Sequence, residues 1–290
     1  MRTTLIPLSV VAAAVLAALA GGRSEVASAA PASCAKASLT LVNDGQLTIG
    51  TDNPAFPPWF GGGEKTKPWK INDPNSGKGF ESAVAYAVAK RLGFAASEVR
   101  WAYSPFARTI APGRKAFDFG INQISYTPAR AKVLAFSASY YNVNQAIVAL
   151  KGTRVAGVRS IAGLRRYKLG AQLGTTSYQF IVNRIKPSGT PSAFDDNTAA
   201  VTALKNKQID GLIVDLPTAF YVTAVQVPKG RIVGQFASTG NQERFGMVFQ
   251  RGNPLVGCVN NALAAMKRTG TLKRIQQIWL AKVTGAPVLK

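Results

Sequence analysis

The sequence contains no histidine, and that absence removes several kinds of chemistry at once. Without an imidazole group there can be no Ser-His-Asp triad, no Cys-His pair and no histidine-ligated metal centre. Only two cysteines occur in 290 residues, too few for a zinc site built from thiolates. Most familiar hydrolytic mechanisms are therefore excluded, and we expect neither a metal nor a cofactor.

Acidic residues are scarce as well. Asp and Glu number 13 against 35 Lys and Arg, which gives a formal net charge of +22. Such an excess invites polyanionic partners, among them nucleic acids, membrane surfaces and cell-wall polymers. The basic residues are spread along the chain without a run typical of a nucleic-acid-binding arm. We therefore favour a solvated basic surface over a specific polyanion site.

Long apolar runs are absent beyond the first thirty residues, where Leu5–Ala20 follows the positive Arg2. Ala27–Ala29 supplies the small side chains of a cleavage site, so residues 1–29 are predicted to be a secretory signal peptide. A membrane anchor is the alternative, but the run is short for a span and Pro7 interrupts it. Removal of this segment leaves 33 basic and 12 acidic residues, a net charge of +21. Export argues against a nucleic-acid partner.

The two cysteines of an exported chain predict one disulfide, between Cys34 and Cys258. Cys34 follows the signal segment and Cys258 lies in a predicted helix, so the bond would fasten the mature N-terminus to the C-terminal part. Lipidation of Cys34 is the alternative. The residues before it, Pro31 to Ser33, lack the aliphatic side chain that a lipoprotein signal places there.

Apolar segments with the periods of strands and helices alternate along the mature chain. Strands are predicted at 47–50, 99–103, 117–121, 133–136, 146–150, 167–171, 211–214 and 245–249. Helices are predicted at 80–92, 105–113, 174–184, from the N-cap Thr198 to 205, at 256–268 and at 271–280. This alternation predicts an α/β protein with largely parallel sheets, and a break near residue 150 indicates two lobes. The long loop 53–79 is rich in Pro, Gly and Trp, and loops of that length are usually functional or insertions.

Polar residues follow several of the predicted strands, at the end where an open parallel sheet binds its ligands. Asp215 directly ends an apolar strand, and Gly174 to Thr176 would present backbone donors at a helix N-terminus as an anion site. Each position also has a structural interpretation as a helix cap or a surface charge. The strand-end positions are Asp52, Ser125, Arg130, Thr175, Thr176 and Asp215.

Several blocks, taken in order, resemble the polar amino-acid-binding proteins of ABC importers, solute-binding protein family 3. Leu47–Trp59 is similar to the opening strand and pocket loop of that family, and Gly79-Phe80-Glu81 to its helix-start signature. Ala83 stands where the signature has a second acid, so Glu81 is expected to complement the helix dipole. The likeness runs from about Leu47 to Leu280, and its other blocks are 117–132, 136–141, 174–177, 210–215 and the helix pair around 270.

This resemblance implies a ligand site. Arg130 would grip the α-carboxylate of a free amino acid as a planar, two-pronged donor, which lysine could not reproduce. Ser125 and Thr176 would donate hydroxyl hydrogen bonds to the same carboxylate, with Thr175 nearby. Asp215, from the other lobe, would pair with the α-ammonium group.

The ligand's side chain would be sandwiched by Phe56 and Phe106, with Trp59 and Phe60 as alternatives. Local charge in the pocket should outweigh the screened field of the basic surface. Two aspartates there favour a neutral polar or basic ligand, glutamine-like or cationic, over an acidic one. Three further positions match residues of the family that contact the ligand. They are Asp52, Gln172 and, through its backbone carbonyl, Gln123.

The implied fold is α/β and two-lobed, the type II periplasmic-binding-protein-like fold, with two crossing hinge strands near 144–150 and 240–246. The first lobe would take residues 30–148 and, as a C-terminal return, 246–290, while the second would take 149–245. Ligand would enter the cleft, contact both lobes and shift the population toward a closed form.

The predicted function is that of an extracytoplasmic solute-binding protein that delivers an amino acid to the membrane subunits of an ABC permease. It would be a monomer in the periplasm or at the cell surface, and not an enzyme. An exported enzyme on the same fold, a cyclohexadienyl or arogenate dehydratase, is one alternative, for which Glu64 and Glu81 are the candidate general acids. A sensory or adhesive ligand-binding module is the other.

Overall fold

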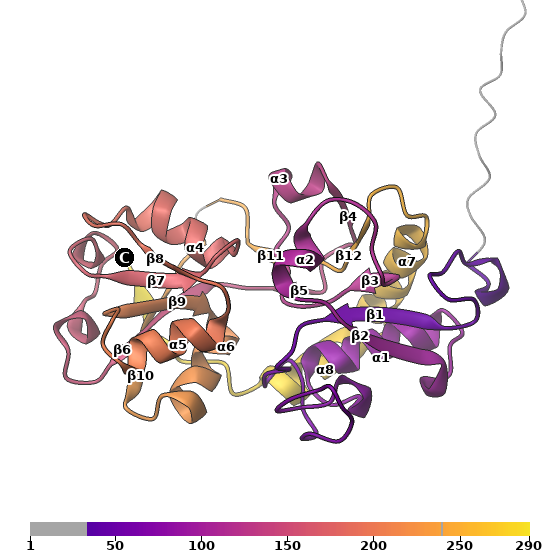
Figure 1. Cartoon of the computed structure of the whole chain (residues 1–290), viewed down its shortest axis with the longest axis horizontal. Coiled ribbons are helices and arrows are strands. Elements are labelled where there is room, and N and C mark those ends of the chain that lie inside the picture. The colour runs from indigo at the N-terminus through magenta and orange to yellow at the C-terminus, as the bar shows by residue number, and fades with distance from the viewer. Residues whose placement is uncertain (1–33, 239) are drawn as a thin grey trace, which may run out of the picture. The chain divides into compact units, whose positions relative to one another are not determined.

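The structure, a computed structural model, describes residues 34–238 and 240–290. The predicted signal peptide lies outside the described residues. Among the residues described, no helix is both long and apolar enough to cross a membrane. The strands form two large sheets and a small two-stranded one (Figure 1).

The first sheet has the strand order β2-β1-β3-β12-β4. Strand β1 pairs in parallel with β2 and β3, and β12 runs antiparallel to β3 and β4. All five residues of β1 are buried, as expected of a central strand with both faces covered. A Cβ on Gly50 would lie 2.5 Å from the Phe117 ring, so only glycine fits there. The bounds are β1 Leu47–Thr51, β2 Val99–Tyr103, β3 Phe119–Gly120, β4 Leu134–Phe136 and β12 Val248–Gln250.

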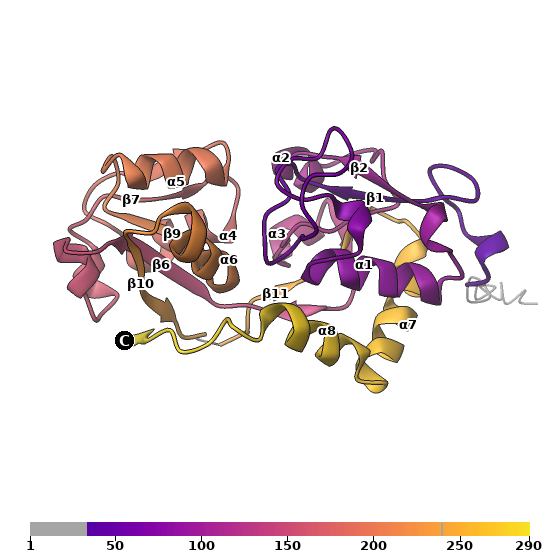
Figure 2. The same cartoon turned by 90° about the horizontal axis from the view of Figure 1, so that it is seen from below.

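Three helices pack together beside this sheet: α1 (Phe80–Arg91), α7 (Leu255–Arg268) and α8 (Thr271–Leu280) (Figure 2). The sequence of α7 explains its packing, since its buried residues recur every three or four positions and form one apolar stripe. Two short helices, α2 (Phe106–Ile110) and α3 (Pro128–Ala131), follow strand ends.

The second sheet has the order β13-β10-β6-β9-β7-β8. Strand β6 is antiparallel to both β9 and β10, whereas β7 is parallel to β8 and β9. The strands are β6 Gln145–Leu150, β7 Leu169–Gln172, β8 Ser192–Phe194, β9 Gly211–Asp215, β10 Gly230–Phe236 and β13 Val288–Leu289. The helices are α4 Thr176–Phe180, α5 Asn197–Lys205 and α6 Leu216–Tyr221, with π-helical turns at Ile181–Ile185 and Val222–Gln226.

The chain crosses between the sheets along two adjacent segments, which confirms the predicted pair of crossing strands. The first crossing precedes the predicted segment 144–150, because that segment forms β6 of the second sheet. Strand β5 (Tyr141–Asn142) leads from β4 to β6, and β11 (Arg244–Phe245) leads from β10 back to β12. The two strands pair antiparallel with each other. A third crossing follows α8, because β13 pairs with β10 in the second sheet. The prediction places all of 246–290 with the first lobe, whereas β13 belongs to the second sheet.

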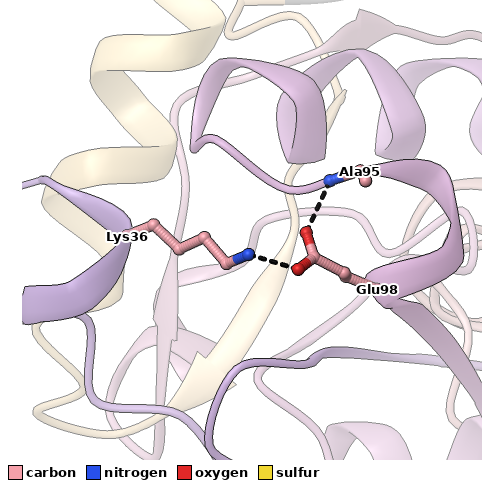
Figure 3. Close-up of polar contacts among 3 residues, drawn as sticks. All are labelled: Lys36, Ala95 and Glu98. Atoms are coloured by element: carbon pink, nitrogen blue, oxygen red, sulfur yellow. Dashed lines mark hydrogen bonds and ion pairs between the residues drawn. The ribbon is translucent and has the colours of Figure 1, made fainter.

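The N-terminal end of the described chain is fastened at three points. Cys34 and Cys258 form the predicted disulfide, and Asp118 Oδ1 accepts a hydrogen bond from Val42 N. Glu98 accepts from Lys36 Nζ at 2.5 Å and from Ala95 N at 2.8 Å (Figure 3). The hydrogen bond from Lys36 lowers the pKa of Glu98. These links hold the segment before β1 against the helices and the sheet.

Candidate ligand-binding site

A cavity of about 230 Å³ lies between the two sheets. From the first-sheet side it is lined by Asp52–Pro54, Phe56, Phe60, Tyr103, Pro105–Ala107, Asn122, Gln123 and Arg130. From the second-sheet side it is lined by Gln172, Thr175, Thr176, Asp195–Thr198 and Asp215. Nine of the ten predicted ligand positions therefore line one cavity, and Ser125 is the exception.

Arg130 is held rigidly at the edge of the cavity. It lies in the first turn of α3, where the Thr127 hydroxyl caps its backbone N–H at 3.1 Å. Its guanidinium donates to Ser125 O at 2.6 Å and to Gly174 O at 2.8 Å, so it bridges the two sides of the pocket. The guanidinium also lies 5.5 Å from the centre of the Phe106 ring. Burial lowers the pKa of Arg130, and the negative charges of Glu243 and Asp215 oppose that shift.

Asp215 ends β9 and faces Arg130 from the other side of the pocket. It occupies the N-cap position of α6 without making the capping hydrogen bond. Its Oδ1 instead accepts from Gln145 Nε2 at 2.7 Å. Burial raises the pKa of Asp215 well above its usual range, and the nearby Glu243 raises it further. A cation beside Asp215 would therefore offset the electrostatic cost of ionising this carboxyl group.

Glu243, just before β11, is a charged residue that was not predicted from the sequence. Its carboxylate accepts from Ser125 Oγ at 2.5 Å and from Gln145 Nε2 at 3.1 and 3.2 Å. Ser125 Oγ also lies 3.2 Å from Thr176 Oγ1 across the pocket. Ser125 thus sits behind the cavity wall, in a network that connects both sheets with the crossing segment.

Thr175 is a helix cap, which is one of the two interpretations that its sequence position allowed. Its hydroxyl caps α4 by accepting from Tyr178 N at 3.1 Å, and it donates to Gln172 O at 2.6 Å. This hydroxyl therefore both donates and accepts a hydrogen bond within its own loop and helix turn. Gln172 in turn donates to Asp195 O at 3.2 Å and holds the neighbouring loop against β7.

The cavity is acidic, although the protein as a whole is strongly basic. Its charged lining consists of one cation, Arg130, and the carboxylates of Asp52, Asp195, Asp196 and Asp215. Asp52 accepts from Asn53 N at 2.7 Å and from Phe106 N at 3.2 Å. Burial raises the pKa of Asp52, and the charge of Asp196 adds to that rise. A third of the 12 acidic residues that follow the predicted signal segment converge on this cavity.

Asp196 also begins the next helix. Its Oδ1 accepts from Ala199 N at 2.8 Å, so Asp196 is the N-cap of α5. The predicted cap, Thr198, is wrong by two residues, because it already lies inside the helix. Asp195 and Asp196 reach the cavity from the loop between β8 and α5, and neither was predicted to bind the ligand.

The aromatic residues divide between cavity and core. Phe56, Phe60 and Phe106 line the cavity, and the Phe56 ring lies 5.9 Å from that of Tyr221 on the second-sheet side. Trp59 is buried in the core of the first sheet and does not line the cavity. Its indole N–H reaches across to Thr218 Oγ1 at 3.1 Å, so it connects the two sides of the pocket.

Gln123 lies at the base of the cavity and is clamped by a buried carboxylate. Its φ of 49° is in the left-handed region, which is uncommon for a residue with a side chain. Glu81 accepts from Gln123 N at 2.7 Å, from Gln123 Nε2 and from Tyr140 Oη. Burial raises the pKa of Glu81 to about 7. Glu81 does lie in the first turn of α1 as predicted, but its side chain fixes Gln123 and is not simply a dipole partner.

The long loop 53–79 supports the rim of the cavity. Asn53 donates to Pro68 O at 2.8 Å and accepts from Lys70 N at 2.9 Å. Asn72 Nδ2, which is buried, donates to Ala55 O at 2.9 Å. The loop is thereby tied to the segment that carries Asp52 and Phe56.

The fold and the site together define a class of protein: an α/β receptor with a polar pocket between its two sheets. Residues 60–282 match the family of bacterial extracellular solute-binding proteins, family 3, and the chain belongs to that family. The match confirms the predicted family.

Curated relatives are amino-acid-binding proteins by name. The chain is 27% identical over 209 residues to ABC transporter arginine-binding protein 1 of Escherichia coli (strain K12), covering 69% of this chain and 81% of the relative. It is 26% identical over 213 residues to the L-cystine-binding protein TcyJ of the same strain, covering 73% of this chain and 76% of the relative.

Solved structures confirm the predicted type II fold. An ancestral arginine-binding protein bound to glutamine superposes with a TM-score of 0.67 at 31% identity, covering 81% of this chain and 98% of that one. The ancestral amino acid-binding protein AncCDT-1, a precursor of cyclohexadienyl dehydratase, superposes with a TM-score of 0.65 at 27% identity. The match covers 81% of this chain and 95% of that one.

Proposed function

We propose that this protein is the receptor of an ABC importer and captures one free amino acid in the cavity between its sheets. The observation that carries the proposal is the pair of opposite charges across that cavity, Arg130 on one side and Asp215 on the other. A free amino acid is a zwitterion, and these two groups complement its two ends. The binding step needs no covalent chemistry, which suits a chain without histidine.

The α-carboxylate is assigned to Arg130. Backbone carbonyls use two of the five guanidinium N–H groups. The other three have no hydrogen-bond partner among residues 34–238 and 240–290, and they can donate to a carboxylate. The Thr176 hydroxyl is the second donor once its hydrogen turns from Ser125 Oγ to the ligand, because the single hydrogen of Ser125 Oγ is donated to Glu243. Ser125 lies behind the wall and joins Thr176 to Glu243, and Asp215 receives the α-ammonium group.

The ligand's side chain is assigned to the acidic half of the cavity, and we propose a cationic amino acid, arginine-like, ahead of a glutamine-like one. Once Asp215 has paired with the α-ammonium group, Asp52, Asp195 and Asp196 remain without a cation in the cavity. Phe56 and Phe106 provide aromatic surfaces on which a guanidinium can stack. Relatives and solved neighbours named for arginine and glutamine support this range.

Closure around the ligand is the signal for transport in this proposal. Contacts already cross between the sides of the pocket, from Arg130 to Gly174 and from Trp59 to Thr218. A ligand held by both sides would add to them and favour the closed form. In this proposal one lobe is built on the first sheet with α1, α7 and α8, and the other on the second sheet, to which β6 and β13 belong. The receptor acts as a monomer in the periplasm or at the cell surface.

The dehydratase alternative has one observation in its favour, the similarity to AncCDT-1. A dehydratase needs a general acid that reaches the ligand. Glu64 and Glu81 do not line the cavity, and both oxygens of Glu81 already accept hydrogen bonds from Gln123 and Tyr140. Incubation with prephenate tests this alternative, and we expect no turnover.

The proposal is tested by thermal unfolding of refolded, ligand-free protein with each of the twenty amino acids. A ligand that binds only the folded state at a hundred times its Kd stabilises it by about 2.7 kcal/mol, enough to raise Tm by several degrees. We expect the largest rise with arginine. Arg130→Ala should weaken binding by at least about a hundredfold, since it removes charge-assisted hydrogen bonds to a buried carboxylate. No rise with any amino acid would overturn the proposal.

Two matched variants separate the roles of the charges. Arg108→Ala removes an exposed arginine outside the cavity and should leave the response to arginine unchanged. Asp196→Asn keeps a capping acceptor for α5 but removes one carboxylate. It should weaken arginine binding about two- to fivefold without weakening glutamine binding, because the lost attraction acts on a cationic side chain. Equal weakening of both ligands would refute the cationic assignment.

A further inference from the structure

The outer surface of this protein is cationic and almost wholly unpaired. Residues 34–290 contain 33 basic and 12 acidic residues. Four of the acids line the cavity, and Asp73, Glu81 and Asp118 are buried. The described residues form a single ion pair, between Lys36 and Glu98 (Figure 3). Few acids therefore remain on the surface to neutralise its cations.

The fold gathers six of these cations where three helix ends meet. Arg91, in the last turn of α1, donates through Nη2 to Thr269 at 3.4 Å and to Thr271 at 3.2 Å. These bonds place the end of α1 against the turn between α7 and α8 (Figure 2). The cations around that turn are all exposed, and we call them the helix-end patch: Lys90, Arg91, Lys267, Arg268, Lys273 and Arg274.

Helix dipoles explain only part of the patch. Lys90, Arg91, Lys267 and Arg268 lie in last turns, where cations complement the negative end of the dipole. Lys273 and Arg274 lie near the N-terminus of α8, where the dipole disfavours cations. No Asp or Glu occurs anywhere in residues 244–290 to offset them. The patch therefore costs free energy in the isolated protein, through repulsion among like charges.

An apolar side chain borders the patch. Ile278 is 65% exposed, and it lies four residues after Arg274 on the same face of α8. Trp279 beside it is only half-buried. A cluster of cations next to an exposed aliphatic and an aromatic residue is the combination that suits the interface of an anionic membrane, where headgroups meet acyl chains.

We propose that the helix-end patch docks this protein on anionic phospholipid headgroups, with Ile278 at the edge of the contact. The patch lies outside the cavity, so docking and ligand capture use different residues. A receptor held at the membrane surface would be concentrated near its permease without a covalent anchor.

The test is co-sedimentation of the protein with phosphatidylcholine vesicles that contain 30% phosphatidylglycerol or none. We expect binding only to the anionic vesicles, with loss of binding at 0.5 M salt because screening removes the attraction. A variant with Lys267, Arg268, Lys273 and Arg274 changed to Gln should bind about 600-fold more weakly, since each of the four cations near the membrane contributes about fivefold.

The matched control removes the same charge elsewhere. Arg154, Lys205, Lys229 and Arg231 are exposed cations of the second-sheet side whose side chains lie outside the cavity. Their joint change to Gln should lower vesicle affinity only a few-fold. If vesicle affinity fell equally in the two variants, the total charge of the protein would determine binding. That result would overturn the assignment to the helix-end patch.

Two further measurements complete the test. Ile278→Ser should weaken vesicle binding without changing binding to a soluble anionic polymer such as heparin. Binding to heparin but not to vesicles would overturn the lipid assignment and indicate a polymer partner. The patch variant should keep an unchanged thermal response to arginine, so that failure of the docking proposal remains distinct from failure of the receptor proposal.

Discussion

Replacement of Glu81 by glutamine should remove a specific pH dependence of stability. The Glu81 side chain is fully buried, and burial raises its pKa from 4.5 to about 7. Between those values the folded protein holds a proton on Glu81 that the unfolded chain has released. The free energy of unfolding therefore falls as pH rises through this window, by about 3 kcal/mol in total, and levels off above pH 7.

Glutamine has nearly the shape of glutamate but does not titrate. Its carbonyl can accept from Gln123 N, and the Gln123 side-chain amide can turn so that its oxygen accepts from the new amide group. Urea unfolding followed by tryptophan fluorescence at pH 4.5, 5.5, 6.5 and 7.5 would measure the difference. We expect Glu81→Gln to be close to wild type at pH 4.5 and more stable than wild type at pH 7.5.

A second variant controls for the effect of removing any one carboxylate, whether buried or exposed. Asp44→Asn removes an exposed carboxylate outside the cavity and should run parallel to wild type at every pH. Asp52 and Asp215 also have raised pKa values and contribute slopes of the same sign. The Asp52 slope cancels when the variant is subtracted from wild type, and the Asp215 slope cancels only in part, because the charge of Glu81 contributes to the raised pKa of Asp215. A difference that stays constant from pH 4.5 to 7.5 would refute the assignment of this slope to Glu81.

Three further perturbations have defined outcomes. Reduction of the bond between Cys34 and Cys258, or Cys258→Ser, should lower the free energy of unfolding by up to roughly 5 kcal/mol, since the bond closes a loop with a sequence separation of 224. Gly79→Ala should severely reduce the yield of folded protein, because φ is +94° and the new Cβ would lie 2.4 Å from Phe60 Cα. Asp196→Ala should cost about 1 kcal/mol in urea unfolding as α5 loses its N-cap, whereas Asp196→Asn should cost little.

The sequence predicted the elements with strong local periodicity. Helix α8 has the predicted bounds of Thr271–Leu280, and strand β2 those of Val99–Tyr103. The predicted strand 245–249 is split into β11 and β12, because β11 pairs with β5 while β12 joins the first sheet. Strand β10, over 230–236, was missed, and so were the short strands β5, β8 and β13, since long-range pairing and not local composition defines them.

The residues of the site can be divided in the same way, into those marked by the local sequence and those brought together only by folding. Asp52 and Asp215 lie directly at the ends of apolar segments, so their position at strand ends could be inferred from the chain. Arg130 lies in α3, well after β3 ends, and its role was implied by the family resemblance. Asp195 and Glu243 come from loops that approach the pocket only after folding, and no local pattern marks them. The scarcity of acids was the available signal. In a chain with so few carboxylates, an adjacent Asp-Asp pair ahead of a helix was a candidate for the site.

A crystal structure of the refolded protein with arginine tests the central claim most directly. The account predicts one arginine in the cavity, with its carboxylate within hydrogen-bonding distance of the Arg130 guanidinium and its α-ammonium group beside Asp215. Its guanidinium should point toward Asp52, Asp195 and Asp196. A ligand bound in the reverse orientation, or bound outside this cavity, would contradict the account.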